Sequence, residues 1–321
     1  MYTRILIPLD TSELAEQVLP YARLLARGFK APVELLRIIE PMSPELVDPR
    51  HGLDLERVVT DMRVIGQEYL GKIATSLRDH GLAVSCEVCE GEPAPQIVAE
   101  AQREPGALIA MTTHGRSGIA RWVLGSVADK VLRATPTPLL LVCSQENGAA
   151  AQDRSLTTVI VPLDGSPEAE QILPHVVALA RSLHLKVVLA RVTPSREEYH
   201  RFLEYHYEVD PGPTLTKVFE GPYEEFSKVV NAKAMEYLHE KVQELRLQRL
   251  PSVEVQLLHG NPAGSIVDLA QETKGGLVAM TTHGRSGVGR WVLGSVTGRV
   301  VRYCGSPVLV IRSVKGETKE V

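Results

Sequence analysis

The chain has 321 residues, 44% of them hydrophobic and 23% charged, which is an ordinary composition for a globular protein and enough chain for two domains. Its formal net charge is −4, so it lacks the basic excess that is typical of proteins that bind duplex nucleic acid. No run of about 18 apolar residues occurs and a strand-like segment begins at Arg4, so we expect no membrane-spanning helix, no signal peptide and a cytoplasmic location.

The first half alternates apolar runs of strand length with amphipathic segments. Expected strands cover Arg4–Leu9, Val33–Ile39, Val84–Glu90, Ala107–Thr112 and Leu139–Cys143, and expected helices cover Ser12–Ala26, Leu55–Asp79, Gln96–Arg103 and Ser126–Ala134. Near-continuous apolar strands that alternate with helices indicate a parallel sheet covered on both faces. Ligands of such sheets bind beyond the carboxyl ends of the strands.

The second half repeats this order of elements. Its expected strands cover Thr158–Leu163, Val187–Val192, Val253–Leu258, Leu277–Thr281 and Val308–Ile311, and its expected helices cover Glu168–Ser182, Ser227–Arg249, Gly264–Thr273 and Ser295–Tyr303. The pattern therefore predicts the same α/β architecture twice.

Sequence identity between the halves shows that the repeat is a domain duplication. Residues 111–127 recur at 280–296 with two differences, and Ile5–Asp10 matches Val159–Asp164. The offset is 169 residues for the first match and 154 for the second, which leaves 15 extra residues in the second half; we place them within Pro194–Tyr223. The period is far longer than that of solenoid repeats. We expect a first domain over 1–146, a linker over 147–156, a second domain over 157–314 and a polar tail over 315–321.

Two of the four cysteines, Cys86 and Cys89, form a C-x-x-C pattern that also occurs in metal and redox sites. Residues three apart on a strand point to opposite faces, so the two thiols of this expected strand would diverge. We interpret them as ordinary strand cysteines and assign no metal site.

A glycine-rich loop joins the fourth strand of each half to the next helix. Gly115, Gly118 and Gly125 would let the backbone approach a phosphate, and the helix that begins at Ser126 offers N–H groups to an anion. Arg116 can offset phosphate charge. In the alternative interpretation, Gly125 makes a turn and Ser126 only caps its helix. Because the loop is nearly identical in two halves whose flanking segments have diverged, we favour anion binding.

This loop resembles the Gly-x2-Gly-x9-Gly-Ser/Thr motif of the universal stress protein family, once at 115–126 and again at 284–295. Pro8-Leu9-Asp10 and Pro162-Leu163-Asp164 resemble the first-strand Pro-x-Asp of that family, and Ile38 and Val192 match its second-strand position near adenine. The resemblance covers nearly the whole chain. It implies two tandem Rossmann-like domains of the adenine nucleotide alpha hydrolase-like type, each a five-stranded parallel sheet flanked by helices. It also implies ATP or another adenine nucleotide as ligand, with Mg²⁺ as a candidate companion ion.

The resemblance implies a nucleotide site in each half. The expected contacts are Pro8, Asp10, Ile38, Thr112, Gly115, Arg116, Gly118, Gly125, Ser126, Pro162, Asp164, Val192, Thr281, Gly284, Arg285, Gly287, Gly294 and Ser295. One departure concerns Thr112 and Thr281, which stand where the family has the first glycine of the motif. Each adds a Cβ and a methyl group beside the expected phosphates, which predicts weaker binding.

Several residues near the expected site also have structural interpretations. Asp10 and Asp164 each follow the first strand of a half, where an acidic residue can instead help to cap the next helix. For His114 and His283 we favour a hydrogen bond that structures the loop over catalysis. We expect the two tryptophans, at 122 and 291, to pack beneath the loop.

The leading functional hypothesis is an adenine-nucleotide-binding stress-response regulator with two sites and little or no catalysis. The first alternative is a slow ATP hydrolase or a nucleotide-transferring enzyme, although the G-x4-G-K-[ST] loop of P-loop enzymes is missing from the sequence. The second alternative is an interaction module that binds no nucleotide. For partners we expect an intramolecular pseudo-dimer of the two domains through their last strands and a candidate homodimer, with no nucleic acid and no membrane.

Overall fold

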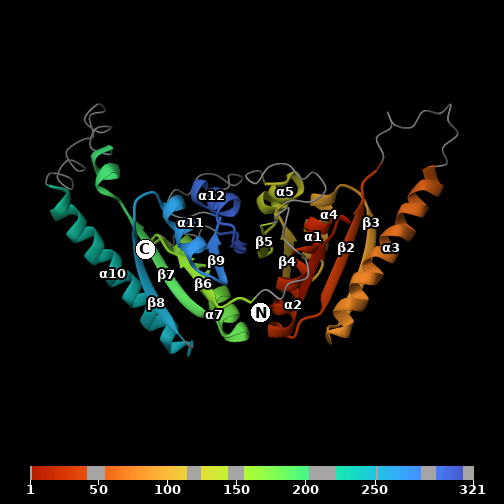
Figure 1. Ribbon diagram of the computed structural model, residues 1–321, viewed down its shortest axis with the longest axis horizontal. Coiled ribbons are helices and arrows are strands. Elements are labelled where there is room, and N and C mark those ends of the chain that lie inside the picture. The colour runs from red at the N-terminus through yellow and green to blue at the C-terminus, as the bar shows by residue number, and fades with distance from the viewer. Residues whose placement is uncertain are drawn as a thin grey trace, which may run out of the picture. The chain divides into compact units, whose positions relative to one another are not determined.

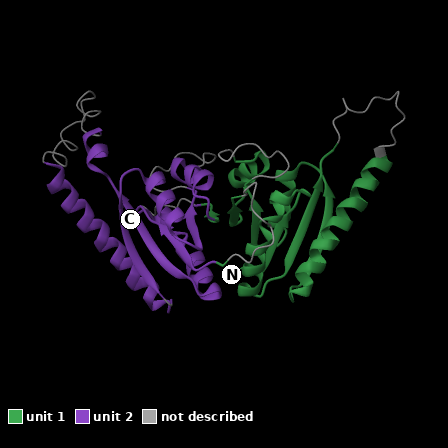
Figure 2. Ribbon diagram, in the orientation of Figure 1, with its two compact units in different colours: residues 1–155, 289–292, 307–312 green, residues 156–288, 293–306, 313–321 purple. Residues whose placement is uncertain are grey.

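A computed structural model describes residues 2–41, 55–113, 124–143, 155–201, 222–250, 252–282 and 294–313. The chain forms two compact units (Figure 2). Unit 1 contains Met1–Ser155 together with the C-terminal segment Pro307–Arg312, and unit 2 begins at Leu156. The last strand of the sequence therefore belongs to the same unit as the first half of the chain.

Unit 1 is a parallel sheet with helices on both faces, in the strand order β3-β2-β1-β4-β5 (Figure 1). Its strands are β1 (Arg4–Pro8), β2 (Val33–Ile39), β3 (Val84–Glu90), β4 (Ala107–Thr112) and β5 (Leu139–Val142), and its helices are α1 (Glu13–Glu16), α2 (Leu19–Phe29), α3 (Leu55–Asp79), α4 (Pro93–Gln102) and α5 (Ser126–Ala134). β10 (Val308–Ile311) extends this sheet by pairing antiparallel with β5. The strand order reverses between β1 and β4, which is the usual place for a ligand in an open α/β sheet.

Unit 2 repeats the arrangement with the strand order β9-β6-β7-β8, all parallel. Its strands are β6 (Thr158–Pro162), β7 (Lys186–Thr193), β8 (Val253–His259) and β9 (Gly276–Thr281), and its helices are α6 (Pro167–Glu170), α7 (Leu173–Leu183), α10 (Tyr223–Leu247), α11 (Pro262–Glu272) and α12 (Ser295–Tyr303). The predicted fold class, tandem α/β domains with parallel sheets and flanking helices, is confirmed.

The central strands explain why the apolar pattern is nearly continuous. Ile5, Leu6 and Ile7 of β1 are completely buried, so successive side chains on both faces of the strand lie in the core. β3 is an outer strand, and its mixture of exposed and half-buried residues matches an edge position. The buried strands fix the positions of their own carboxyl ends, where the described residues of the candidate site lie.

The single helix predicted after the first strand of each half is wrong. Ser12–Ala26 forms two helices, α1 and α2, which are separated near Gln17 and Val18. Pro20 causes the break, because it lacks the N–H that a continuous helix would donate to the residue four positions earlier. Pro174 has the same effect in unit 2, where α6 and α7 replace the predicted helix at 168–182.

Aromatic packing anchors the beginning of the segment in which we placed the 15 extra residues. Residues 196–201 are helical, and Tyr199 is 2% exposed. Its ring centroid lies 4.7 Å from that of Phe226 and 5.7 Å from that of Tyr223, both on α10. Residues 202–221 lie outside the described part of the chain.

Cys86 and Cys89 both lie on β3 and are free thiols. Burial raises the pKa of each thiol above its ordinary value, which disfavours the thiolate that redox and metal chemistry require. Among the described helices, none combines the length and the apolar character needed to cross a membrane.

Candidate functional site

Unit 1 has a cavity of about 250 Å³ at the carboxyl ends of β1, β2 and β4, beside the N-terminus of α5. Its lining comes from five chain segments that the sheet order brings together. The lining residues are Pro8, Leu9, Asp10, Ala15, Arg37, Ile38, Glu40, Pro93, Ile97, Met111, Thr112, Thr113, Gly125, Ser126, Val127 and Ala128. This is where the strand order reverses, as expected for the ligand site of such a sheet.

Unit 2 has a corresponding cavity of about 340 Å³ beside the N-terminus of α12. It is lined by Pro162, Leu163, Asp164, Ala169, Ala190, Val192, Pro262, Ile266, Met280, Thr281, Thr282, Gly294, Ser295, Val296 and Thr297. Nearly every lining position has its counterpart in the first cavity, so the duplication extends to the tertiary surroundings of the site.

The structure gathers twelve of the predicted site residues onto these two walls. Pro8, Asp10, Ile38, Thr112, Gly125 and Ser126 line the first cavity, and Pro162, Asp164, Val192, Thr281, Gly294 and Ser295 line the second. The other six, Gly115, Arg116, Gly118, Gly284, Arg285 and Gly287, lie outside the described residues, as do both loop histidines and both tryptophans. Contact between any of these residues and a ligand stays a prediction.

The aspartate after the first strand of each unit braces a helix cap. Asp10 Oδ1 accepts hydrogen bonds from the backbone N–H of Ser12 at 3.0 Å and from its hydroxyl at 2.6 Å, and Ser12 Oγ accepts from the N–H of Ala15 at 3.1 Å. Asp164 and Ser166 repeat this arrangement at 2.9, 2.6 and 3.2 Å. The capping role that the sequence suggested is therefore present, and both aspartates also line their cavities.

The glycine before each site helix forms a backbone hydrogen bond to a threonine near the end of the preceding strand and adds no side chain to the cavity. Gly125 N–H donates to the carbonyl of Thr113 at 2.7 Å, and Gly294 N–H donates to that of Thr282 at 3.0 Å. Their φ angles are −57° and −55°, which every residue type adopts. The backbone therefore does not require glycine at either position.

The alternative in which Ser126 caps its helix is not borne out. Ser126 and Ser295 are the first helical residues, and the N-cap positions are Gly125 and Gly294, neither of which offers a side-chain cap. The nine-residue helices α5 and α12 thus begin at a cavity wall with backbone N–H groups at their N-termini, a feature that favours anions.

Sequence reasoning missed a tyrosine–glutamate pair next to each site. Tyr69 Oη donates to Glu16 Oε1 at 2.9 Å, and Tyr237 Oη donates to Glu170 Oε1 at 2.8 Å. Burial raises the pKa of both tyrosines far above the ordinary value, and the neighbouring glutamate raises it further. In the structure each tyrosine is the fifteenth residue of a 25-residue helix, α3 or α10. The predicted helices did not reveal this match, because Tyr237 is the eleventh residue of the predicted Ser227–Arg249.

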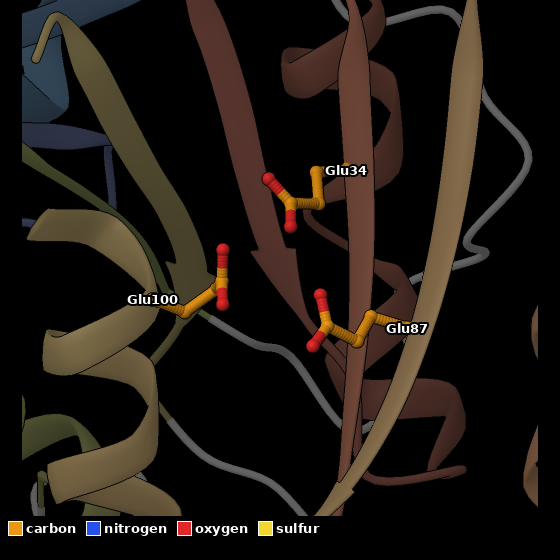
Figure 3. Close-up of side chains that lie close together, drawn as sticks. All are labelled: Glu34, Glu87 and Glu100. Carbon is orange, nitrogen blue, oxygen red and sulfur yellow. The ribbon is translucent and has the colours of Figure 1, made fainter. Parts of the chain in front are cut away.

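A second cluster of charged residues lies near the amino ends of the strands of unit 1, away from the cavity. Figure 3 shows Glu34, Glu87 and Glu100, whose carboxylates include oxygens within 4.8 Å of one another. The buried Arg4 bonds the Glu34 carboxylate through Nη1, and its Nη2 donates to the carbonyl of Glu100 at 2.6 Å. Arg103 contacts Glu87 at 3.3 Å and Glu34 at 3.4 Å.

These two guanidinium groups supply the positive charge that a metal ion would otherwise provide, so we interpret the cluster as an ion-pair network. Burial, followed by the charge of Glu34, raises the pKa of the Glu100 carboxyl above its ordinary value. Unit 2 has Thr158, Val188, Gln256, Leu269 and Glu272 at the positions that correspond to the five residues of the network. The network is therefore a property of unit 1 and not a requirement of the fold.

The doubly wound sheet, with a cavity at its strand ends and a helix N-terminus in the cavity wall, defines a Rossmann-like α/β domain that is present twice. The family model described as the universal stress protein family matches residues 1–142 and 156–312, and the chain belongs to this family.

Relatives are known for one half and for the whole chain. Universal stress protein MJ0531 of Methanocaldococcus jannaschii is 32% identical over 142 residues, which cover 44% of this chain and 82% of that protein. A universal stress protein of Mycolicibacterium smegmatis is 24% identical over 317 residues and 96% of both chains. The crystal structure of a universal stress protein from Archaeoglobus fulgidus aligns with 97% of this chain and 96% of the Archaeoglobus chain, with a TM-score of 0.63 and 18% identity. The two proteins therefore have the same fold.

Proposed function

We propose that the protein binds an adenine nucleotide, such as ATP, in the cavity of each unit and acts as a stress-response regulator with little or no catalysis. Membership of the universal stress protein family supports this ligand class, since the chain carries the family's glycine motif in both halves. The observation that carries the proposal is the pair Gly125 and Gly294. Both are glycine although their φ angles suit any residue, and both line a cavity. The missing Cβ leaves room for a phosphate beside the helix N-terminus.

The rest of each wall suits the other parts of a nucleotide. Apolar side chains such as Ile38, Ile97 and Met111 can cover the faces of a base in the first cavity. A few polar groups, among them Asp10 and Ser126, can fix the orientation of a sugar and a phosphate. This mixture of an apolar wall and sparse polar groups supports binding of a small molecule with both kinds of surface.

The described lining favours binding over turnover. Fast phosphoryl transfer needs charge stabilisation at the γ-phosphate and a positioned nucleophile. Asp164 is the carboxylate among the described residues of the second cavity wall, and its Oδ1 already accepts two hydrogen bonds from Ser166. Backbone N–H groups and serine hydroxyls hold a ground-state phosphate about as well as a transition state, so they contribute to affinity more than to rate.

A Mg²⁺ ion would be held mainly by phosphate oxygens, with one or two carboxylates from the protein. The described lining offers Asp10 and Glu40 in the first cavity and Asp164 in the second. These carboxylates are compatible with a nucleotide-bound cation.

Calorimetric titration tests the proposal directly. We expect up to two ATP sites per chain and a preference for ATP over GTP, and freshly purified protein should release an adenine nucleotide when it is denatured. If no adenine nucleotide binds saturably at millimolar concentration and none is released, the proposal fails and the protein is an interaction module without nucleotide.

A further inference from the structure

The two cavities differ in charge at the carboxyl ends of the second and third strands of each unit. In unit 1 these ends carry Glu40, Glu90 and Glu92, and all three side chains are exposed. In register, Ile39 pairs with Glu90 in unit 1, and the corresponding pair in unit 2 is Thr193 with His259. The counterparts of the three glutamates are Pro194, His259 and Asn261, none of which is acidic.

Two of the unit 1 glutamates, Glu40 and Glu92, lie on or next to the cavity. Glu40 is part of its lining, and Glu92 directly precedes Pro93, a lining residue at the start of α4. Glu90 forms an ion pair with Arg63 at 2.5 Å, so its charge is offset locally. Arg37 also lines the first cavity, whereas its counterpart Arg191 lies over the Tyr237 ring and is not among the lining residues of the second cavity. Arg37 offsets one of the two remaining carboxylates, so Glu40 and Glu92 together leave the first rim more acidic by one charge.

The corresponding unit 2 side chains serve structural hydrogen bonds. Asn261 Oδ1 accepts from the N–H of Gly264 at 3.2 Å and caps α11. The ring Nδ1 of His259 lies 2.9 Å from Thr193 Oγ1. The rim of the second cavity is thus polar without acidic groups at these three positions.

A lysine on the long helix of unit 2 increases the contrast. Lys241 Nζ lies 3.1 Å from Glu170 Oε2 and 2.8 Å from Glu244 Oε1, so it offsets the charge of the glutamate that Tyr237 also contacts. The same position of α3, the nineteenth residue of each helix, is Ile73. Glu16 of unit 1 therefore receives no ammonium group from that position.

The second cavity is also the larger one, at about 340 Å³ against about 250 Å³. Val192 stands where the first cavity has Ile38, and this removes one carbon from the wall. Charge and size both favour the second cavity for a large anion.

From these differences we propose that the two sites are not equivalent: the unit 2 cavity is the tighter site for free ATP, and the acidic rim of the unit 1 cavity makes it the weaker one. This inference rests on the proposed function. Glu40 and Glu92 repel the polyphosphate chain, and the repulsion is weaker for AMP, which carries fewer phosphate groups. Because both glutamates are exposed, salt screens the repulsion over a Debye length of about 10 Å at 0.1 M ionic strength.

Single-site variants of the full chain separate the two affinities. Gly125→Val leaves the unit 2 site and Gly294→Val leaves the unit 1 site, and each is titrated with ATP and with AMP in the presence of a chelator. At low ionic strength we expect Gly125→Val to bind ATP about tenfold more tightly than Gly294→Val does, and the ratio should shrink to about threefold or less with AMP or at high salt.

Charge removal tests the residues responsible. Adding Glu40→Gln and Glu92→Gln to Gly294→Val should tighten ATP binding several-fold and should change AMP binding less. Glu104→Gln is the matched control, because Glu104 is exposed and follows the opposite end of α4. It removes the same charge far from the cavity and should leave ATP affinity unchanged.

The possible results distinguish this inference from the proposed function. Binding of no adenine nucleotide by the wild-type chain or by either variant overturns both. Equal ATP affinities of the two variants at low ionic strength, or tighter binding by Gly294→Val, overturn the inference and leave the proposed function in place. Titration of the wild-type chain gives a check that needs no variant: two affinity classes for ATP support the inference, and a single class contradicts it.

Discussion

Gly125 and Gly294 show how a single backbone position can report on function. Each is the N-cap of a site helix with an extended conformation that an alanine or a serine would also adopt. A serine there would improve the cap. Neither copy has this better-capping residue. The simplest physical reason for glycine at both positions is that it leaves space for a ligand.

We predict that Gly125→Val combined with Gly294→Val abolishes nucleotide binding while the fold survives. The branched side chains fill the cavity wall where the phosphate is expected, but they impose no backbone strain because φ is already negative. Calorimetry measures binding, and circular dichroism confirms folding. An unchanged affinity in the double variant would place the ligand elsewhere.

The catalytic rate is a further property that can be tested at single residues. We predict ATP turnover far below the common enzyme range of about 1–1000 per second. A steady-state assay with Mg²⁺ or Mn²⁺ measures it. Turnover of about one per second or more that is lost on changing His114 and His283 to Ala would identify an enzyme instead of a binding protein.

Glu100 gives unit 1 a specific pH dependence. Its pKa is raised in the folded state by burial and by Glu34, so the folded chain keeps this proton to a higher pH than the unfolded chain does. The free energy of unfolding should therefore fall as pH rises from the ordinary glutamate pKa of about 4.3 through the raised pKa of Glu100, and this contribution should level off above it.

Glu100→Gln should remove this part of the slope, because the variant has no proton to lose. Urea unfolding measured across the acidic range, with the exposed Glu104→Gln as the matched control, provides the test. If Glu100→Gln and the wild-type chain lose stability with pH at the same rate, the assignment to Glu100 is wrong.

At the scale of elements, a tyrosine hydroxyl on each long helix forms a hydrogen bond to the site region: Tyr69 does so from α3 and Tyr237 from α10. The tyrosine of the helix bonds the glutamate at the end of α1 or α6, directly after the segment that Asp10 or Asp164 braces. This link joins the second crossover of each unit to its first.

We predict that Tyr69→Phe lowers the free energy of unfolding by about 1–3 kcal/mol, since it removes a hydrogen bond to a charged acceptor and leaves that acceptor half-buried. Tyr237→Phe should have a smaller effect, because Lys241 still contacts Glu170. Chemical denaturation of the two variants measures both. A cycle with Glu16→Gln checks the pairing: no coupling between Tyr69→Phe and Glu16→Gln would mean that the bond contributes nothing.

The segment after the first strand shows where the spacing of apolar residues gave a wrong prediction of a secondary-structure element. The apolar stripe of Ser12–Ala26 has helical spacing, which led to one predicted helix. A proline in the second position of α2 is compatible with a helix start and not with a helix interior, and this is what the structure shows in both units. Attention to Pro20 and Pro174 would have corrected the prediction from sequence.

At the scale of the whole molecule, the pairing of the last strands remains the central prediction. β10 lies in the part of the chain that the second family match covers. It pairs antiparallel with β5 within unit 1, with Val308 opposite Leu141. We predict that the two halves of the chain associate through these strands, because an uncovered apolar edge strand is an aggregation liability. Solution scattering should give a compact particle; two independent beads on a linker would contradict the prediction.

The sequence by itself determined the duplication, the alternation of strands and helices, the glycine motif and the family, because each is encoded within a few adjacent residues or by direct identity between the halves. Tertiary structure decided what depends on strand order. Arg4 meets Glu100, 96 positions along the chain, because β1 and β4 are neighbours and α4 connects β3 to β4. The difference between the two cavities also arises there, since Glu40, Pro93 and Gly125 become neighbours only when the strands lie in the order β3-β2-β1-β4-β5. No local pattern contains that order, and for this reason the charge of each site could be assigned only from the folded chain.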